Sequence, residues 1–169
     1  MYGKASDIQI WEEICYICDI LGSGKYKQAP ILIWGTLCAE TQLGDYPQKK
    51  ALSMGIAQID EETFINIQLY VTGKKKLNEY IKTTIGLDIA EIKYNELKYN
   101  TFLSILFCRL FYMRIPEEIP IGVDKQAYYW KNYYNTMFGK GTVEHYIESF
   151  YRKTKNEFLS NYIGKYRGV

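Results

Sequence analysis

Apolar residues recur at three- and four-residue spacing along nearly the whole chain, and this periodicity most constrains its fold. Ile8, Trp11, Ile14 and Cys18 are one such series near the start. Residues at this spacing lie on one face of an α-helix. Only residues 54–59 suggest a short β-like strip. The sequence therefore predicts a mainly α protein.

Capping and stop signals divide the pattern into helices. Ser6 and Gln9 form a capping-box signature, and Pro30 stands where the first turn of a helix tolerates proline. Asp60 and Asp124 are further candidate caps. We expect helices over residues 6–22, 30–43, 60–71, 74–85, 95–113, 124–137 and 142–162, with the 95–113 helix buried at the centre and Gly139-Lys140-Gly141 as a turn.

The length and composition predict one globular domain. The chain has 169 residues, of which 47% are hydrophobic, and it carries 17 tyrosines and four prolines. Compact domains usually hold about 100 to 150 residues, and no repeat or long linker interrupts the pattern. We expect a single helical domain over residues 1–169.

Charge and cysteine usage argue against several functions. The net charge of +2 is small and the basic residues are dispersed, so we expect no nucleic-acid partner. Cys15 and Cys18 form a C-x-x-C pair, but without a second pair, and with His145 as the one histidine, a four-ligand zinc site lacks ligands. We therefore expect no metal and no cofactor. We also expect no stable membrane insertion, because no apolar run approaches roughly 18 residues.

Glu40 is the candidate proton donor. It follows the apolar segment 31–39, in the last turn of the expected 30–43 helix. A carboxylic acid that gives up a proton near neutral pH needs a raised pKa, and burial against apolar side chains supplies one. A short loop later comes a strip in which Gly55 leaves room for a substrate and Gln58 offers a donor and an acceptor.

These residues resemble a known family. Glu40-Thr41, then Ser53-x-Gly55-x-x-Gln58 and Thr63, are similar to the signature of lysozyme-like lytic transglycosylases and goose-type lysozymes, in which E-[ST] precedes G-[IL]-[AM]-Q. Residues 100–105 match the buried helix of that family, and Tyr134-Asn135 with the later Gly141-x-Val143 resembles its A-Y-N-x-G and G-x-V motifs. The resemblance covers roughly residues 30–150.

The resemblance implies a lysozyme-like α+β fold in which the β-like strip lines a sugar cleft. It implies that Glu40 is the catalytic acid and that Tyr134 reaches it. The implied substrate-binding residues are Ser53, Gly55, Ile56, Ala57, Gln58 and Asn135. Two departures affect the cleft wall: Tyr133 replaces the usual alanine, and two extra residues separate Asn135 from the next glycine.

The mechanism depends on whether a second carboxylate acts. Without one, Glu40 would cleave the peptidoglycan glycan strand as a lytic transglycosylase and leave anhydro-muramoyl ends; this is the leading interpretation. Asp60 or Asp45 could instead activate water in a hydrolytic muramidase. A third hypothesis is a non-enzymatic phage tail or assembly protein that retains the fold.

The expected location follows from the start of the chain, where Asp7, Glu12 and Glu13 interrupt any secretion signal. We expect synthesis in a host cytoplasm and action in the periplasm or cell wall. A phage endolysin released with the help of a holin, or a lysin carried in a virion tail, fits this expectation. Delivery of a bacterial enzyme by a secretion machine is the alternative.

Overall fold

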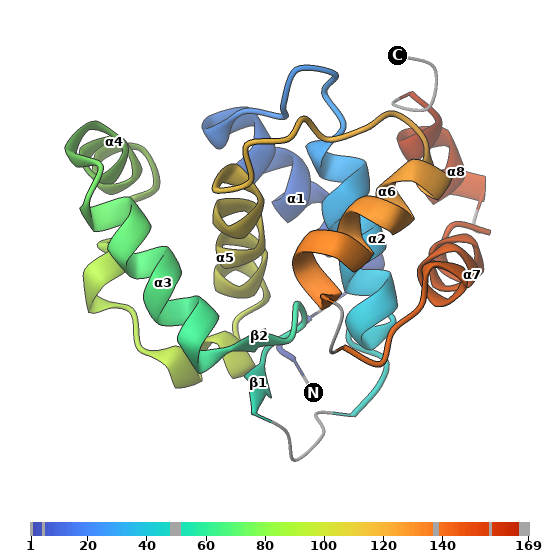
Figure 1. Ribbon diagram of the computed structural model, residues 1–169, viewed down its shortest axis with the longest axis horizontal. Coiled ribbons are helices and arrows are strands. Elements are labelled where there is room, and N and C mark those ends of the chain that lie inside the picture. The colour runs from blue at the N-terminus through green and yellow to red at the C-terminus, as the bar shows by residue number, and fades with distance from the viewer. Residues whose placement is uncertain (1, 5, 48–51, 137–138, 156, 166–169) are drawn as a thin grey trace.

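Three helices form the centre of the computed structural model: α1 (Asp7–Leu21), α2 (Ala29–Thr41) and α5 (Thr101–Met113). The model describes residues 2–4, 6–47, 52–136, 139–155 and 157–165. Figure 1 shows α5 between the α3/α4 pair on one side and α2, α6 and α7 on the other. The predicted mainly α class is confirmed, and so is the buried position of α5, eleven of whose thirteen residues are buried.

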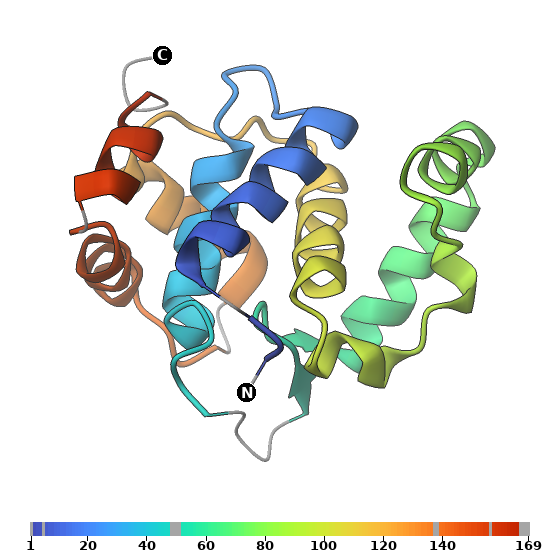
Figure 2. The ribbon, with the colours of Figure 1, turned by 180° about the vertical axis from the view of Figure 1, so that it is seen from behind.

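The remaining elements surround this centre, and Figure 2 shows α1 crossing the rear of α2. They are β1 (Ser53–Met54), β2 (Ile59–Asp60), α3 (Glu61–Thr72), α4 (Lys75–Ile85), η1 (Ile89–Glu91), η2 (Tyr94–Lys98), α6 (Val123–Trp130), η3 (Lys131–Asn135), α7 (Val143–Lys153) and α8 (Glu157–Gly164). The buried hydrophobic side chains of these elements form a continuous core.

Several helix ends lie where the sequence predicts them. The Ser6 hydroxyl accepts a hydrogen bond from the Gln9 amide at 3.1 Å, which caps α1. Asp60 caps α3 in the same way, and Gly86 ends α4 in the left-handed conformation. These ends are local features, so residues a few positions apart are sufficient to specify them.

The β-like strip is a minimal antiparallel hairpin. Ser53 pairs with Asp60, and Met54 pairs with Ile59. The Tyr94 hydroxyl donates to the carbonyls of Leu52 and Ile59, at 2.7 and 2.9 Å. A hairpin this short gains most of its order from such contacts with the rest of the protein.

The predicted start of the central helix is wrong. A 3₁₀ segment, η2, occupies residues 94–98, and α5 begins at Thr101 rather than Asn95. The Asn100 side chain accepts from the Leu103 amide at 3.0 Å, and this cap competes with continuation of the helix through Asn100.

The predicted cap and extent of the 124–137 helix are also corrected. Gly122, with φ of 100°, is the N-cap of α6, and Asp124 lies in the first turn. After Trp130 the helix widens into the π-helical turn η3, which ends at Asn135. Met137 lies outside the described residues. Single π-helical turns within helices occur frequently at functional sites.

The predicted 142–162 helix is two helices. Thr142 caps α7 by accepting from the His145 amide at 3.1 Å, as expected. α7 ends at Lys153, and the Thr154 hydroxyl donates to the Phe150 carbonyl at 2.7 Å. A hydroxyl bonded back to the preceding turn often bends or ends a helix, and α8 then begins at Glu157.

Candidate functional site

Glu40 is exceptional on its own helix. Twelve of the thirteen residues of α2 are buried, and Glu40 is the one that is partly exposed. The neighbouring α7 packs tightly on this helix, because a Cβ on Gly35 would lie 2.0 Å from the Tyr146 hydroxyl. α2 therefore serves as a rigid, buried support that presents one carboxyl group.

The Glu40 carboxyl lines a pocket of about 320 Å³. The Trp130 indole N–H donates to its Oε1 at 3.2 Å. A Cβ on Gly141 would lie 2.5 Å from the Trp130 ring, so this glycine leaves the space that the indole occupies. The other lining residues are Ala39, Asn135, Lys140, Gly141 and His145. We call this cavity the Glu40 pocket.

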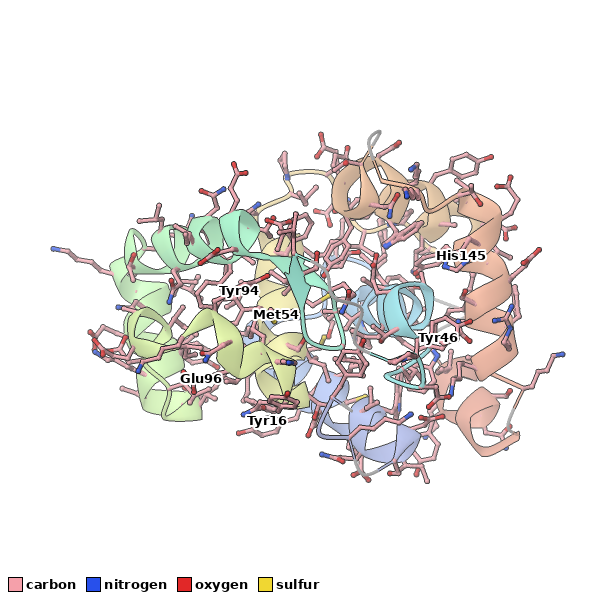
Figure 3. All side chains as sticks on the ribbon, turned by 90° about the horizontal axis from the view of Figure 1, so that it is seen from below. Tyr16, Tyr46, Met54, Tyr94, Glu96 and His145 are labelled. Atoms are coloured by element: carbon pink, nitrogen blue, oxygen red, sulfur yellow. The ribbon has the colours of Figure 1, made fainter. Side chains whose placement is uncertain are left out.

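His145 forms the α7 side of the Glu40 pocket. Its Nε2 lies 2.8 Å from the Ala39 carbonyl oxygen, and Figure 3 shows the side chain directed from α7 toward the end of α2. A carbonyl oxygen only accepts, so Nε2 carries the proton.

Tyr134 lies close to Glu40 but bonds to the hairpin. Its hydroxyl donates to the Ala57 carbonyl at 2.6 Å. Burial, and to a smaller degree Cys108 and Glu40, raises the pKa of Tyr134 well above its ordinary value. The ring also stacks on Tyr112, with centroids 5.4 Å apart. The phenol therefore stays protonated and fixed in place, and it is close enough to Glu40 for the two groups to interact electrostatically.

The Gly55–Ala57 strip is buried in the protein, whereas the sequence led us to expect that it would face a substrate. All three of its residues are buried, and a Cβ on Gly55 would lie 2.4 Å from the Leu97 carbonyl oxygen. The Ala57 amide donates to Ser104 at 3.0 Å, while its carbonyl accepts from Tyr134. The absent side chain of Gly55 thus permits close packing against the protein interior, and the peptide groups of Ala57 are used internally.

Thr41 connects this strip to the helix that carries Glu40. Its hydroxyl donates to the Ile56 carbonyl at 2.8 Å. Gln58 is partly exposed, with φ of 50°, and its side-chain Nε2 donates to the Gly55 carbonyl at 2.8 Å. Ser53 is also partly exposed. Of the expected substrate-binding residues in this strip, Ser53 and Gln58 are the ones with accessible side chains.

Asn135 is brought to the Glu40 pocket, where it is one of the lining residues. Its Oδ1 accepts from Lys131 at 2.8 Å, and the same ammonium donates to the Gly139 carbonyl at 2.9 Å. These bonds hold the end of the π-helical turn in place. The Asn135 amide nitrogen is directed toward Gly141, where a Cβ would approach it to 2.9 Å.

The two candidate second carboxylates are engaged elsewhere. Asp45 is half-exposed and pairs with Lys4 at 2.5 Å and with Lys153. Partial burial opposes the effect, but hydrogen bonds from Lys153 and Lys4 lower the pKa of Asp45. Asp60 is exposed, and its two oxygens accept from the amide and hydroxyl of Thr63 at 2.8 and 2.9 Å. Neither carboxylate lines the Glu40 pocket.

Trp130 and Lys140 belong to the site although no sequence motif indicated them, and His145 was expected only as a possible metal ligand. Trp130 stands one helical turn before Tyr134, so the α6 periodicity would have placed both on one face. His145 stands three residues after its cap, Thr142, in the first turn of α7. No feature of the sequence near His145 predicts that the first turn of α7 lies against Ala39.

No cluster of three or more potential metal ligands occurs within the described residues. Cys15, Cys18, Cys38 and Cys108 take part in no disulfide bond within the described residues, and burial raises the pKa of Cys18 to about 12. Within the described ranges, no helix has both the length and the apolar character that crossing a bilayer requires. The polar chemistry of the site thus rests on Glu40 and the side chains around it.

Comparisons with protein-family models, with curated proteins and with solved structures gave no match.

Proposed function

We propose that this protein is a peptidoglycan lytic transglycosylase with a lysozyme-like arrangement, and that Glu40 is its general acid and base. The observation that carries the proposal is the placement of Glu40. It is the one partly exposed residue of a buried helix, it lines a pocket, and it accepts a hydrogen bond from Trp130. A positioned carboxyl group at the edge of a cavity is what proton transfer to a bound substrate requires.

The proposed reaction uses this one carboxyl group twice. Glu40 protonates the oxygen that bridges N-acetylmuramic acid and N-acetylglucosamine, and the bond from that oxygen to the muramoyl C1 breaks. The muramoyl 6-hydroxyl then bonds to C1 and returns its proton to the Glu40 carboxylate. The products are an anhydro-muramoyl end and a new N-acetylglucosamine end, with the enzyme restored.

The neighbours of Glu40 support each half of this cycle. The Trp130 N–H stabilises the carboxylate that forms when the proton leaves, since hydrogen bonds to charged acceptors are the stronger ones. Tyr134, by bonding to Ala57, holds the hairpin beside the acid. Lys140 and Asn135 supply polar groups to the lining of the pocket.

The positions of Asp45 and Asp60 favour this reaction over hydrolysis. An inverting hydrolase needs a second carboxylate placed so that a water molecule fits between it and the acid. Asp45 is bound by two ammonium groups and Asp60 by Thr63, and both lie outside the pocket lining. Ring closure by the substrate's own hydroxyl needs neither of them.

The test is digestion of purified peptidoglycan, followed by mass spectrometry of the new ends. We expect anhydro ends from the parent protein and a rate lower by about 10² to 10⁴ for Glu40→Gln, with an unchanged circular dichroism spectrum. Glu12→Gln, at an exposed position of α1, is the matched control and should retain full activity.

Three results would contradict the proposal. Reducing ends would indicate the hydrolytic muramidase instead. Parental activity in Glu40→Gln would remove Glu40 from the chemistry. An inactive parent protein on walls of several types would favour a non-enzymatic phage tail or assembly protein.

A further inference from the structure

Arg109 is a buried cation at the opposite end of the molecule from Glu40. It lies in the last turns of α5 and is 6% exposed. Its Nε donates to the Gly22 carbonyl at 2.9 Å, so the side chain reaches the loop between α1 and α2. In the described part of the chain, no carboxylate lies within ion-pair distance of its guanidinium.

The guanidinium is largely but not completely removed from water, since its terminal nitrogens are not among the fully buried atoms that lack a hydrogen-bond partner. A buried charge normally has a partner of opposite sign, because removing an ion from water is unfavourable. Burial accordingly lowers the pKa of Arg109. The single carbonyl bond at Nε leaves the terminal guanidinium nitrogens without a protein acceptor among the described residues.

The Arg109 side chain lines a second pocket, of about 190 Å³. Several of its lining residues belong to the segment that follows α5. In Figure 1 this segment passes over the upper end of the molecule, beside the α1–α2 loop. The other lining residues are Gly24, Tyr112, Met113, Ile115, Pro116, Glu117, Glu118 and Ile119. We call this cavity the Arg109 pocket.

The walls of the Arg109 pocket are held in place by contacts from other helices. The Tyr129 hydroxyl of α6 donates to the Glu117 carbonyl at 2.9 Å. The Tyr70 hydroxyl of α3 donates to the Met113 carbonyl at 3.1 Å. A ligand would therefore enter a largely preformed site, and little binding energy would be lost in ordering it.

We propose that the Arg109 pocket binds the carboxylate of a small organic molecule with an apolar body. The guanidinium nitrogens form the fork that matches a carboxylate. Met113, Ile115 and Ile119 offer apolar contact to the remainder of the ligand. Glu117 and Glu118 are exposed at the same pocket, and their negative charges disfavour doubly charged anions such as phosphate. This site is independent of the proposed glycan cleavage.

The test is NMR titration of the full chain, labelled with ¹⁵N, with butyrate and separately with inorganic phosphate at matched ionic strength. We expect butyrate to shift the Arg109 Nε–Hε signal and the Gly24 amide in a saturable manner. Arg109→Gln should weaken butyrate binding by about tenfold or more, because it removes a charge-assisted hydrogen-bond pair.

Arg114→Gln is the matched control on the same helix end. Arg114 lies outside the pocket lining and stacks on Phe111 at 5.1 Å, so its replacement should leave butyrate binding unchanged. A Glu117→Gln, Glu118→Gln double variant changes exposed positions and keeps Arg109. It should bind butyrate about two- to threefold more tightly at low ionic strength.

The double variant provides a test even if Arg109→Gln does not fold. Butyrate shifts that do not saturate, equal binding by Arg109→Gln, or a double variant that binds no more tightly would overturn the site. Tighter binding of phosphate than of butyrate would overturn the carboxylate assignment.

Discussion

Glu40 and Asp45 are close in the sequence, on either side of the end of α2, but their surroundings differ in kind. Glu40 accepts from a neutral indole N–H and lines a cavity. Asp45 lies among Lys4, Asp7 and Lys153 in a network of alternating charges that joins the chain start, α1 and the end of α7. We call this network the Asp45 cluster.

The difference shows how the partner of a carboxylate determines its use. The Trp130 N–H is a neutral donor and adds no positive charge of its own that would hold the carboxyl group ionised, as the proton transfers proposed for Glu40 require. Two ammonium groups hold a carboxylate in the ionised form and in one position. The surroundings of Glu40 therefore suit the proposed proton transfer. The Asp45 cluster links the chain start, α1 and α7 to one another.

Among the substitutions that test the difference between the Glu40 pocket and the Asp45 cluster, the largest effect is expected at Trp130. Trp130→Phe keeps the aromatic packing and removes the N–H that Glu40 accepts. The rate of glycan cleavage should fall by about tenfold, because a hydrogen bond to a charged group contributes about 1.5 to 3 kcal/mol. Steady-state kinetics on soluble glycan fragments measure this. A rate equal to that of the parent would mean that the indole only packs against the acid.

A smaller effect, on stability alone, is expected at Asp60. Asp60→Ala removes the cap of α3 and should lower the free energy of unfolding by about 1 kcal/mol. Urea denaturation measures the loss, and the digestion assay should show full activity. Asp60→Asn, which retains a capping side chain, is the matched control. Loss of activity in both variants would instead assign Asp60 the water-activating role of a muramidase.

The smallest effect is expected at Asp45. Asp45→Asn should lower the free energy of unfolding by less than about 1 kcal/mol at neutral pH, since the carboxylate is half-exposed and solvent screens its pairs. Cleavage activity should be unchanged. Loss of activity in Asp45→Asn would contradict the conclusion that Asp45 stabilises the fold and takes no part in the reaction.

The pH dependence of the Asp45 effect has a defined sign. The folded-state pKa of Asp45 lies below its ordinary value of 3.8. Its contribution is therefore fully present above that value and is lost as the pH falls through the lowered folded-state pKa. The stability difference between parent and Asp45→Asn should accordingly shrink below about pH 4. A difference that persisted at pH 2 would show that the pairs do not depend on ionisation.

Local sequence signals were sufficient for much of the fold. The ends marked by Ser6, Asp60, Gly86 and Thr142 agree with the structure, because each cap or stop acts within a few residues. The predictions failed where two local signals competed. At Asn100 the side-chain cap prevails over the apolar pattern, and at Thr154 the helix stops within an otherwise regular series.

The site was predictable in part. The position of Glu40 in the last turn of a buried helix follows from the apolar run before it. The sequence does not predict what Gly55 packs against, because a glycine in a turn has the same local signature whether it faces a ligand or the protein interior. Leu97 and Ser104, which occupy the space beside it, are distant in the sequence.

The sequence alone was enough to specify the mainly α class, most helix ends and the one charged residue near the end of an apolar helix. These follow from periodicity and from side chains that bond to the adjacent backbone. The tertiary structure alone decided that Trp130 bonds to Glu40, that Lys4 and Lys153 bind Asp45, and that Arg109 lines a pocket. Such contacts join residues far apart in the chain, so they depend on how the helices pack.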